Sequence, residues 1–317
     1  MREIRCDRIL TFWVAILCLF LAGQVNAQDT PLPPTVSLSD SLLLVRVPEA
    51  GDVAYFRISR EDITVNEVGN LTSRTVSTGR FKREVVHGNE AGTHMDRYTW
   101  KDFFHTRSED VEALIEPVEV TAIRGFSYDL SSDDRHSVPP IHIGGLAKTA
   151  ETFAFFLVSW DVAAITHAVS DRPDYPIRSL NRIGDRIVGA DAYLPASFDF
   201  TPVVSDFSYT RRPYATMLFG LSMIDQTPAA LIRFESGANP IMYRFSSNRV
   251  NIHLTGREWT IGSVYLGLSD NTIRRGELRS TMVVSQEAMM PGKRVRHPMT
   301  VFQNVVLERI TKQGYEN

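Results

Sequence analysis

The fold class is decided by Val250-Asn251-Ile252-His253-Leu254-Thr255, along which apolar and polar residues alternate. A period of two is typical of a β-strand with one buried face and one face against solvent or a polar cavity. Three further strand-like runs flank this stretch, and the segments between the runs are rich in turn residues. The flanking runs are 241–245, 260–266 and 278–285, and the separating segments are 246–248, 256–258 and 269–271. We therefore predict an antiparallel meander with turns at those three segments.

Short runs rich in branched and aromatic residues also recur through the first half of the chain. They are 41–47, 53–58, 72–77, 80–86, 97–104, 118–123, 126–130 and 153–160. The run 153–160 is the most apolar after residue 27, and we interpret it as a central strand buried on both faces. A short core helix that continues through Ala164 is the alternative, because periodicity alone does not separate the two.

Helical periodicity is scarce elsewhere in the sequence. Residues 108–114 and 301–310 are the best candidates for short helices, and the second could equally form a closing strand. We predict an all-β class, either a large antiparallel sandwich or an open barrel-like sheet, with one or two short helices.

Residues 1–27 have the three-part pattern of a cleavable signal peptide. A charged start is followed by an apolar stretch from Ile9 to Ala22 and then by small or polar residues. Val25 and Ala27 occupy the positions that signal peptidase reads, so we expect cleavage between Ala27 and Gln28. The apolar stretch is shorter than the roughly 20 residues that a membrane-spanning helix needs. We therefore expect a secreted or periplasmic protein.

The remaining chain divides into a tether and a body. Residues 28–40 are rich in Pro, Thr, Ser and Asp, which predicts an extended polar tether. Residues 41–317 are expected to form a single β-rich domain, with the turn cluster 171–176 as a candidate subdomain boundary. Both cysteines, Cys6 and Cys18, lie in the signal segment, so the body must be stabilised by packing without disulfides.

Composition argues against two classes of partner. A formal net charge of −3 gives no support for nucleic-acid binding through a basic face. After the signal segment there is no apolar run long enough for a transmembrane helix.

Candidate metal ligands are histidines near glycine-rich or proline-rich segments. His87 and His94 lie in a Gly-rich stretch with Asp96 downstream, and His136 and His142 flank a Pro-Pro pair. None of them forms the short His pairs that are typical of zinc sites. We interpret them as exposed loop histidines and assign no metal and no cofactor.

Candidate catalytic groups are equally isolated. Ser127 sits in a stretch that resembles a nucleophile elbow but has Asp129 where glycine is needed, so we interpret it as an outward strand residue. Ser159, Asp161 and His167 have the residue types of a catalytic triad, yet triads are assembled from distant segments and closeness in sequence adds nothing. We assign no catalytic residue to any of these positions.

Glycoside cleavage uses two carboxylates, and the sequence offers one candidate pair. Asp185 and Asp191 bracket a short segment, with Tyr193 and Phe198 nearby as a platform for a sugar. Asp and Gly favour turns, so a turn or hairpin role is the preferred interpretation.

A basic stretch and a glycosylation sequon are candidate surface features. The basic stretch 293–297 is interpreted as a solvated loop, with contact to an anionic partner as the alternative. Asn70 begins an Asn-Leu-Thr sequon, which matters only if the source glycosylates its proteins.

The function that these observations favour is non-catalytic binding of an apolar or amphipathic small molecule or lipid in the cell envelope. The aromatic residues that could line such a site are Phe153, Phe155, Trp160, Phe219 and Trp259, and core packing is the alternative role for all of them. A secreted hydrolase that acts on glycans or esters is the runner-up.

Overall fold

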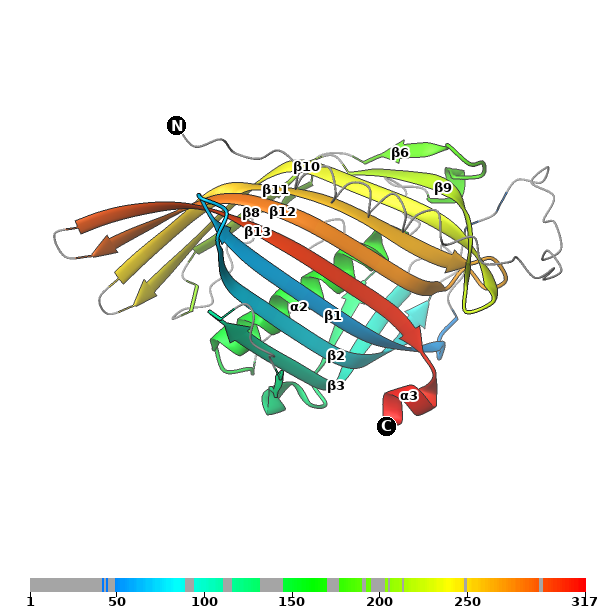
Figure 1. Cartoon of the computed structure of the whole chain (residues 1–317). Helices are drawn as coiled ribbons and strands as arrows, with labels where there is room; N and C mark the ends of the chain where they lie inside the picture. Colours follow the sequence, from blue (N-terminus) through cyan, green and yellow to red (C-terminus); the bar gives the residue numbers. More distant parts are fainter. Residues whose placement is uncertain are drawn as a thin grey trace, which may run out of the picture. The chain divides into compact units, whose positions relative to one another are not determined.

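The computed structural model places one curved antiparallel sheet around the helix α2 (Figure 1). It describes residues 42, 44, 49–88, 94–110, 116–131, 145–169, 177–189, 192–194, 203–204, 206–212, 214–247, 250–290 and 293–317, which belong to the unit Leu42–Asn317. The predicted signal segment with its cleavage site at Ala27 and Gln28, the tether 28–40 and the turn cluster 171–176 lie outside the described residues.

Thirteen strands form the sheet. Their bounds are β1 (Val53–Asn66), β2 (Leu71–Gly88), β3 (His94–Ser108), β4 (Val118–Glu119), β5 (Ser127–Ser131), β6 (Arg186–Val188), β7 (Ala192–Leu194), β8 (Asp206–Arg211), β9 (Ala215–Ile224), β10 (Thr227–Ser247), β11 (Val250–Gly267), β12 (Ile273–Met290) and β13 (Lys293–Ile310). Their order is β4-β3-β2-β1-β13-β12-β11-β10-β8-β7, with β5 beside β3, β9 beside β10 and β6 beside β9.

The first long strand pairs with the last one, which brings the two ends of the body together. Tyr55 of β1 lies opposite Ile310 of β13, and the ladder continues to Asn66 opposite Met299. The ends of the strand order do not pair with each other, so the sheet formed by the described strands stays open. The predicted all-β class with an open barrel-like sheet is confirmed, and the sandwich alternative is wrong because one sheet holds these strands.

The sheet has a buried inner face and an exposed outer face. On β1, Phe56 and Ile58 point inward and are buried, whereas Arg57 points outward and is exposed. On β11, Leu254 is buried, and Trp259 on the other face is exposed. The alternation that predicted the strands therefore continues over their full length, as a half-buried sheet requires.

Several strands are longer than predicted because two glycines do not form turns. The segment 256–258 lies inside β11, and Gly79 lies inside β2, which joins two runs predicted as separate strands. A Cβ atom at Gly256 would lie 2.3 Å from the carbonyl oxygen of Val283, and one at Gly79 would lie 2.8 Å from the ring of Trp100. Both glycines allow a close approach within the sheet, which is the other role of glycine in a strand.

The other two turns of the meander are as predicted. β11 and β12 are joined at residues 268–272, and Asn271 has the positive φ of 48° that suits a tight turn. β10 ends at Ser247 and β11 begins at Val250, so the predicted turn at 246–248 falls at a hairpin. The meander itself is confirmed.

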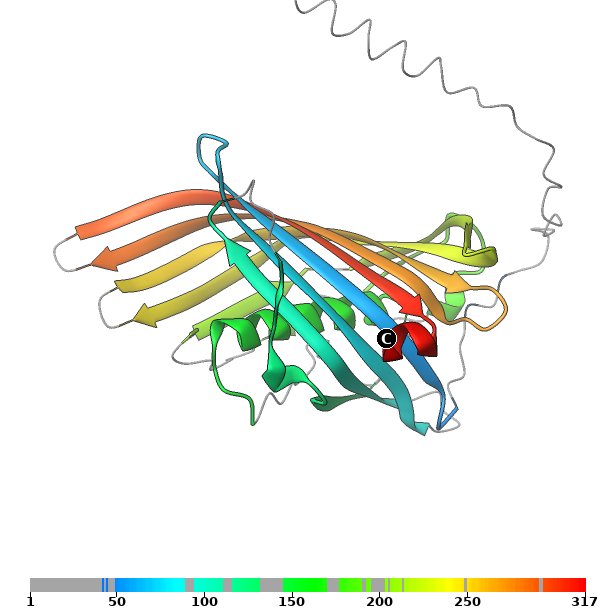
Figure 2. The same ribbon diagram turned by 60° about the horizontal axis from the view of Figure 1, so that its bottom comes forward.

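The apolar run 153–160 forms a helix, so its interpretation as a central strand is wrong. Helix α2 (Ala150–His167) includes the whole run and extends past Ala164, as the alternative proposed. The side chain of Thr149 accepts a hydrogen bond from the backbone of Thr152, and the hydroxyl of Thr152 accepts one from the backbone of Thr149. This capping box fixes the start of the helix, and a helix that is apolar on nearly all sides must be buried. Figures 1 and 2 show it along the inner face of the sheet.

Other local predictions have mixed outcomes. Residues 301–310 belong to β13, which confirms the closing-strand alternative. Residues 118–123 form β4 and a 3-10 turn, η1 (Thr121–Ile123). The stretch 293–297 begins β13 and is not a loop. Of 41–47, only residues 42 and 44 are described, and neither is in a strand. Within 108–114, Ser108 ends β3, and residues 111–114 lie outside the described residues.

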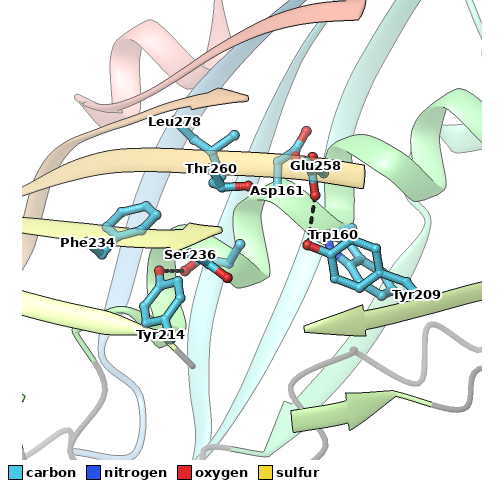
Figure 3. Close-up of a pocket in the computed structure, with 10 residues that line it drawn as sticks. Trp160, Asp161, Tyr209, Tyr214, Phe234, Ser236, Glu258, Thr260 and Leu278 are labelled. Atoms are coloured by element: carbon cyan, nitrogen blue, oxygen red, sulfur yellow. Dashed lines mark hydrogen bonds between the residues drawn. The ribbon is translucent and has the colours of Figure 1, made fainter. Parts of the chain in front are cut away.

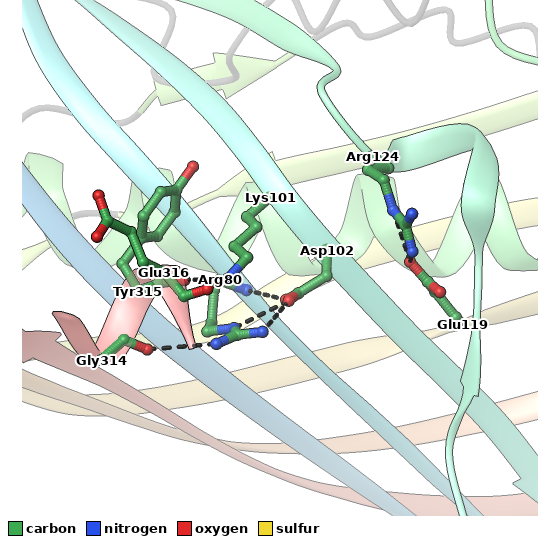
Figure 4. Close-up of polar contacts among 8 residues, drawn as sticks. All are labelled: Arg80, Lys101, Asp102, Glu119, Arg124, Gly314, Tyr315 and Glu316. Atoms are coloured by element: carbon green, nitrogen blue, oxygen red, sulfur yellow. Dashed lines mark hydrogen bonds and ion pairs between the residues drawn. The ribbon is translucent and has the colours of Figure 1, made fainter. Parts of the chain in front are cut away.

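Two shorter elements complete the described structure, η2 (Ile177–Ser179) and the terminal helix α3 (Lys312–Glu316). Helix α3 packs against the outer face near β1, where the rings of Tyr55 and Tyr315 lie 4.9 Å apart. Figure 4 shows Lys101 reaching the carbonyl oxygens of Tyr315 and Glu316. Neither α2 nor any other helix in the described ranges combines the length and apolarity needed to cross a bilayer.

Candidate ligand-binding site

Helix α2 rests on the sheet through a glycine. A Cβ atom at Gly276 of β12 would lie only 2.4 Å from Cγ2 of Ile165. The absence of a side chain at Gly276 therefore lets Ile165 of the helix contact the backbone of the strand. Phe155, Val158 and Ile165 belong to the main apolar core. A second apolar cluster lies at the start of the helix, with Phe153 and Trp160 packed against it. Its buried members are Val204, Phe207, Tyr209, Ile241, Leu254 and Val284. Two cavities lie between α2 and the inner face of the sheet.

The larger space, called here the apolar cavity, has a volume of about 80 Å³. Most of its wall is apolar, and the remainder is charged or polar. The apolar and aromatic lining comprises Phe153, Leu157, Trp160, Phe207, Tyr209, Ile241, Tyr243 and Met282. The charged or amide lining comprises Arg60, Asp161, Glu258 and Gln303. A concave apolar wall with a few convergent polar groups is typical of sites for small molecules.

The smaller space, called here the carboxylate cavity, has a volume of about 40 Å³ and shares Trp160, Asp161, Tyr209 and Glu258 with the apolar cavity. Its other lining residues are Ala164, Tyr214, Phe234, Ser236, Thr260 and Leu278. Figure 3 shows these side chains projecting from α2 and from several strands toward a common space. The two cavities therefore adjoin at a pair of carboxylates.

A buried network of charges and amides joins α2 to the sheet beneath these cavities. Arg60 Nη1 donates to Asp161 Oδ2 at 2.8 Å, and its Nε donates to both oxygens of Asp62 at 3.0 Å. Gln303 Nε2 donates to Asp161 Oδ1 at 2.9 Å, and its Oε1 accepts a bond from Ser280 at 2.9 Å. Groups from α2, β1, β12 and β13 thus satisfy one another where water is excluded, as buried charges require.

Burial raises the pKa of the Asp161 carboxyl to about 7. The positive charge of Arg60 opposes the rise, and the negative charges of Asp62 and Glu258 add to it. Burial works against the charge of Arg60, but Asp62 and Asp161 outweigh this effect and raise the pKa of the guanidinium further. Arg60 therefore stays charged, and Asp161 exchanges a proton near neutral pH.

Glu258 is the second carboxylate of the site, and Tyr209 holds it in place. The hydroxyl of Tyr209 donates to Glu258 Oε2 at 2.7 Å (Figure 3). The rings of Trp160 and Tyr209 lie 5.5 Å apart at 85°, edge to face. Glu258 occupies an inward position of β11, next to the exposed Trp259.

The five aromatic residues predicted to line a site lie in three different environments. Phe153 and Trp160 line the apolar cavity. Phe155 is fully buried in the main core, where it contacts Trp100 and Phe103 edge to face. The expectation for Phe219 and Trp259 is wrong, because both lie exposed on the outer face, at positions of β9 and β11 that point away from α2.

The three residues that have the residue types of a catalytic triad do not form one. Ser159, Asp161 and His167 all lie on α2, and Asp161 is bonded to Arg60 and Gln303. Ser127 lies exposed on β5, where its hydroxyl donates to Thr99 Oγ1 at 3.1 Å. Its place in a strand agrees with the interpretation of Ser127 as an outward strand residue.

Asp185 accepts hydrogen bonds in a turn, which agrees with the turn role predicted from its residue type. Its Oδ2 accepts hydrogen bonds from the backbone nitrogens of Asn181 and Arg182 at 2.8 and 2.7 Å. Asp191 and Phe198 lie outside the described residues, and Tyr193 is in β7. A carboxylate pair is brought together, but it consists of Asp161 and Glu258, which sequence reasoning did not pair.

The histidines do not gather around a metal site in the part of the chain that is described. His94 Nε2 lies 3.4 Å from Asp96 Oδ2, and Arg83 also binds that carboxylate. His87 is exposed at the end of β2, and His136 and His142 lie outside the described residues. No group of three His, Cys, Asp or Glu in the described ranges could hold a metal ion.

The two surface features also have defined places. Asn70 lies exposed at the turn between β1 and β2, with its backbone nitrogen bonded to Asn66 Oδ1. Arg294 and Arg296 are exposed at the start of β13 and bind Glu287 and Ser285 of the neighbouring strand β12.

Sequence reasoning missed Arg60, Glu258, Thr260 and Gln303. A signal for them did exist, because Arg60 continues the inward alternation of Phe56 and Ile58 along β1. A charged residue at an inward position must find a partner, and this identifies it as a candidate for a buried polar site.

Comparison with known proteins gives no family for this chain. No family description and no curated protein matches it. Among solved structures, OccK2 (OpdF) of Pseudomonas aeruginosa in complex with glucuronate has 8% identity and a TM-score of 0.20, covering 83% of this chain and all of that one. A putative outer membrane lipoprotein-sorting protein domain from Vibrio parahaemolyticus has 8% identity and a TM-score of 0.15, covering 83% of this chain and 89% of that one.

A DUF1329 family protein from Desulfovibrio piger has 8% identity and a TM-score of 0.12, covering 82% of this chain and 87% of that one. These scores are too low to support a functional assignment.

Proposed function

We propose that this protein binds an apolar or amphipathic small molecule between α2 and the inner face of the sheet, without converting it chemically. The single observation that carries the proposal is the apolar cavity, in which Phe153, Leu157 and Met282 face the same space as Arg60 and Asp161. Protein interiors are close-packed, so the apolar side chains that line an empty cavity lack van der Waals contacts. A bound ligand would supply these contacts. The ligand's apolar part would contact this wall, and its polar part would meet the charged groups.

The proposed location is the secretory or periplasmic space. This part of the proposal is supported by the sequence pattern of residues 1–27 and by the absence of cysteine from the rest of the chain. N-terminal sequencing of the protein exported by its own cells tests it. A mature protein that begins at Gln28 is expected, and one that begins at Met1 would contradict it.

The ligand proposal is tested by two neighbouring substitutions on β12. Met282 lines the apolar cavity, whereas Val283 is exposed on the outer face. Met282→Trp should fill the cavity and weaken binding of 1-decanol and decanoate at least about tenfold, while Val283→Trp should leave binding unchanged. Isothermal titration calorimetry measures both, and mass spectrometry of a solvent extract identifies any ligand that co-purifies.

Two results would overturn the ligand proposal. One is a purified protein that carries no extractable ligand and binds none of 1-decanol, decanoate and decylamine. The other is an unchanged affinity in Met282→Trp when the variant folds as the parent does by circular dichroism.

Hydrolysis of a glycan or ester is the second candidate function, favoured by the meeting of Asp161 and Glu258 in one cavity. A carboxyl whose pKa is raised to about 7 can act as a general acid at neutral pH. It ranks second because about 40 Å³ holds about three water molecules rather than a sugar ring. Turnover on a glycan or ester panel that disappears in Glu258→Gln would move it to first place.

A further inference from the structure

The carboxylate cavity has an excess of negative charge. Asp161 and Glu258 line it, and Asp62 acts on Asp161 from β1. Arg60 is the cation that acts most strongly on Asp161, and its guanidinium already binds both Asp62 and Asp161. The described side chains that line this cavity include the carboxyl groups of Asp161 and Glu258 and no cation. Arg107 is a further cation nearby, and it acts on Tyr243 in the adjoining apolar cavity. A buried excess of this sign favours a cationic ligand.

The walls of the same cavity are aromatic. Trp160 and Tyr209 form an edge-to-face pair on one side, and Tyr214 and Phe234 form a stacked pair with ring centroids 5.2 Å apart. Aromatic rings around a small space attract organic ammonium groups through their π faces, most strongly when water is excluded. The rings and the carboxylates therefore select for the same sign of charge.

Thr260 adds an acceptor that nothing in the described structure uses. Its side chain lines the cavity and it is 8% exposed, and no hydrogen bond joins its hydroxyl to another described residue. Its hydroxyl can therefore accept a hydrogen bond from a donor that enters the cavity. Figure 3 shows Thr260 on the same side of the space as Asp161 and Glu258.

We propose that the carboxylate cavity holds the ammonium group of an amphiphile whose apolar chain lies in the adjoining apolar cavity. This inference rests on the ligand-binding function proposed above and specifies the class of ligand. A primary ammonium donates to Thr260 and Glu258 and is surrounded by the rings of Trp160 and Tyr214. An anionic head group would meet the excess negative charge, and a neutral one would leave that charge uncompensated.

The volumes of the two cavities support this division. About 40 Å³ suits a small head group, and the apolar space of about 80 Å³ accepts the first part of an alkyl chain. The two spaces share four lining residues, so one molecule can occupy both.

The test compares one chain length with three head groups. Decylamine, 1-decanol and decanoate are titrated into the purified protein at pH 7, below their aggregation concentrations. Decylamine should bind at least about tenfold more tightly than the other two. Glu258→Gln keeps an acceptor for the Tyr209 hydroxyl but removes the charge, so it should abolish this preference. Glu235→Gln, on the exposed outer face, is the matched control.

Thr260→Val removes the hydroxyl that accepts a hydrogen bond from the ligand and leaves the charge of Glu258 in place. It should weaken binding of decylamine, whose ammonium donates to the Thr260 hydroxyl, and Glu258 should still give decylamine the tighter binding over decanoate. Cation binding should also release protons from Asp161 near pH 7, which appears as a dependence of the titration enthalpy on the buffer.

The outcomes separate this inference from the proposed function. Equal affinity for all three decyl compounds, or tightest binding of decanoate, would overturn the ammonium inference and leave ligand binding intact. A preference for decylamine that persists in Glu258→Gln would also overturn it. Binding of none of the three would overturn the proposed function as well.

Discussion

Arg60 and Asp161 form a buried ion pair that joins β1 to α2, with Nη1 and Oδ2 2.8 Å apart and each side chain 7% exposed. The pair links residues 101 positions apart in the sequence. It stands where the two cavities meet, so the same groups hold the helix and shape the site.

Arg60→Met should destabilise the protein by about 3–5 kcal/mol, because it leaves the buried Asp161 and the half-buried Asp62 without a cation. Arg57→Met is the control on the same strand. Arg57 pairs with Glu308 at 2.7 Å, but its side chain is 61% exposed, and its loss should cost less than about 1 kcal/mol. Urea unfolding followed by circular dichroism measures both, and equal losses in the two variants would contradict the argument.

The raised pKa of Asp161 predicts a specific dependence of stability on pH. Because the folded-state pKa is about 7 and the ordinary value is 3.8, the folded state holds a proton that the unfolded state loses between these values. The stability that this group contributes is full below about pH 4 and is lost as pH rises through about 7. Burial raises the pKa most, Arg60 and Gln303 lower it, and Asp62 and Glu258 raise it further.

The measurement compares the parent with Asp161→Asn, which cannot titrate. The free energy of unfolding of the parent minus that of the variant should fall from pH 4.5 to 7.5 and become constant above. A difference that rises with pH would mean that Arg60 outweighs burial and lowers the pKa.

Most of the sheet could be predicted from local pattern. Apolar and polar residues alternate along β11, because one face of this strand is buried and the other is exposed. The pattern of β13 was less decisive, since residues 301–310 also suit a helix. The lengths of the strands could not be predicted in this way. Gly79 and Gly256 have the residue type of a turn, and only the neighbours across the sheet show that they permit close approach instead.

The site could be predicted only in part. Phe153 and Trp160 were identified by their apolar character, but their run was assigned to a strand because a buried strand and a buried helix share that character. Arg60, Glu258 and Gln303 come from strands far apart in the chain and meet only through the register of the sheet and the position of α2. Alternation places Glu258 on the inner face of its strand, but it does not show that Glu258 meets Asp161.

The contact between Ile165 and Gly276 sets the distance between α2 and the sheet. Gly276→Ala should cost about 1–3 kcal/mol, because the new Cβ would lie 2.4 Å from Cγ2 of Ile165 and the helix must shift. Gly220→Ala in β9 is the matched control, because a Cβ atom there meets nothing within 4 Å. Combining Gly276→Ala with Ile165→Leu, which has no Cγ2 methyl, should recover part of the loss in urea unfolding. A double variant no more stable than the sum of the single changes would contradict this contact.

Lys101 holds α3 on the outer face through contacts with the end of the helix. Lys101 Nζ donates to the carbonyl oxygen of Tyr315 at 2.6 Å and lies 5.6 Å from the centre of that ring (Figure 4). Lys101→Met should speed amide hydrogen exchange in α3, with a loss of global stability below about 1 kcal/mol because the contacts are near the surface. Arg124→Met breaks the pair between Arg124 and Glu119, which is also exposed, and should leave exchange in α3 unchanged. Slow exchange in α3 of the Lys101→Met variant would show that the contact between Tyr55 and Tyr315 holds the helix without it.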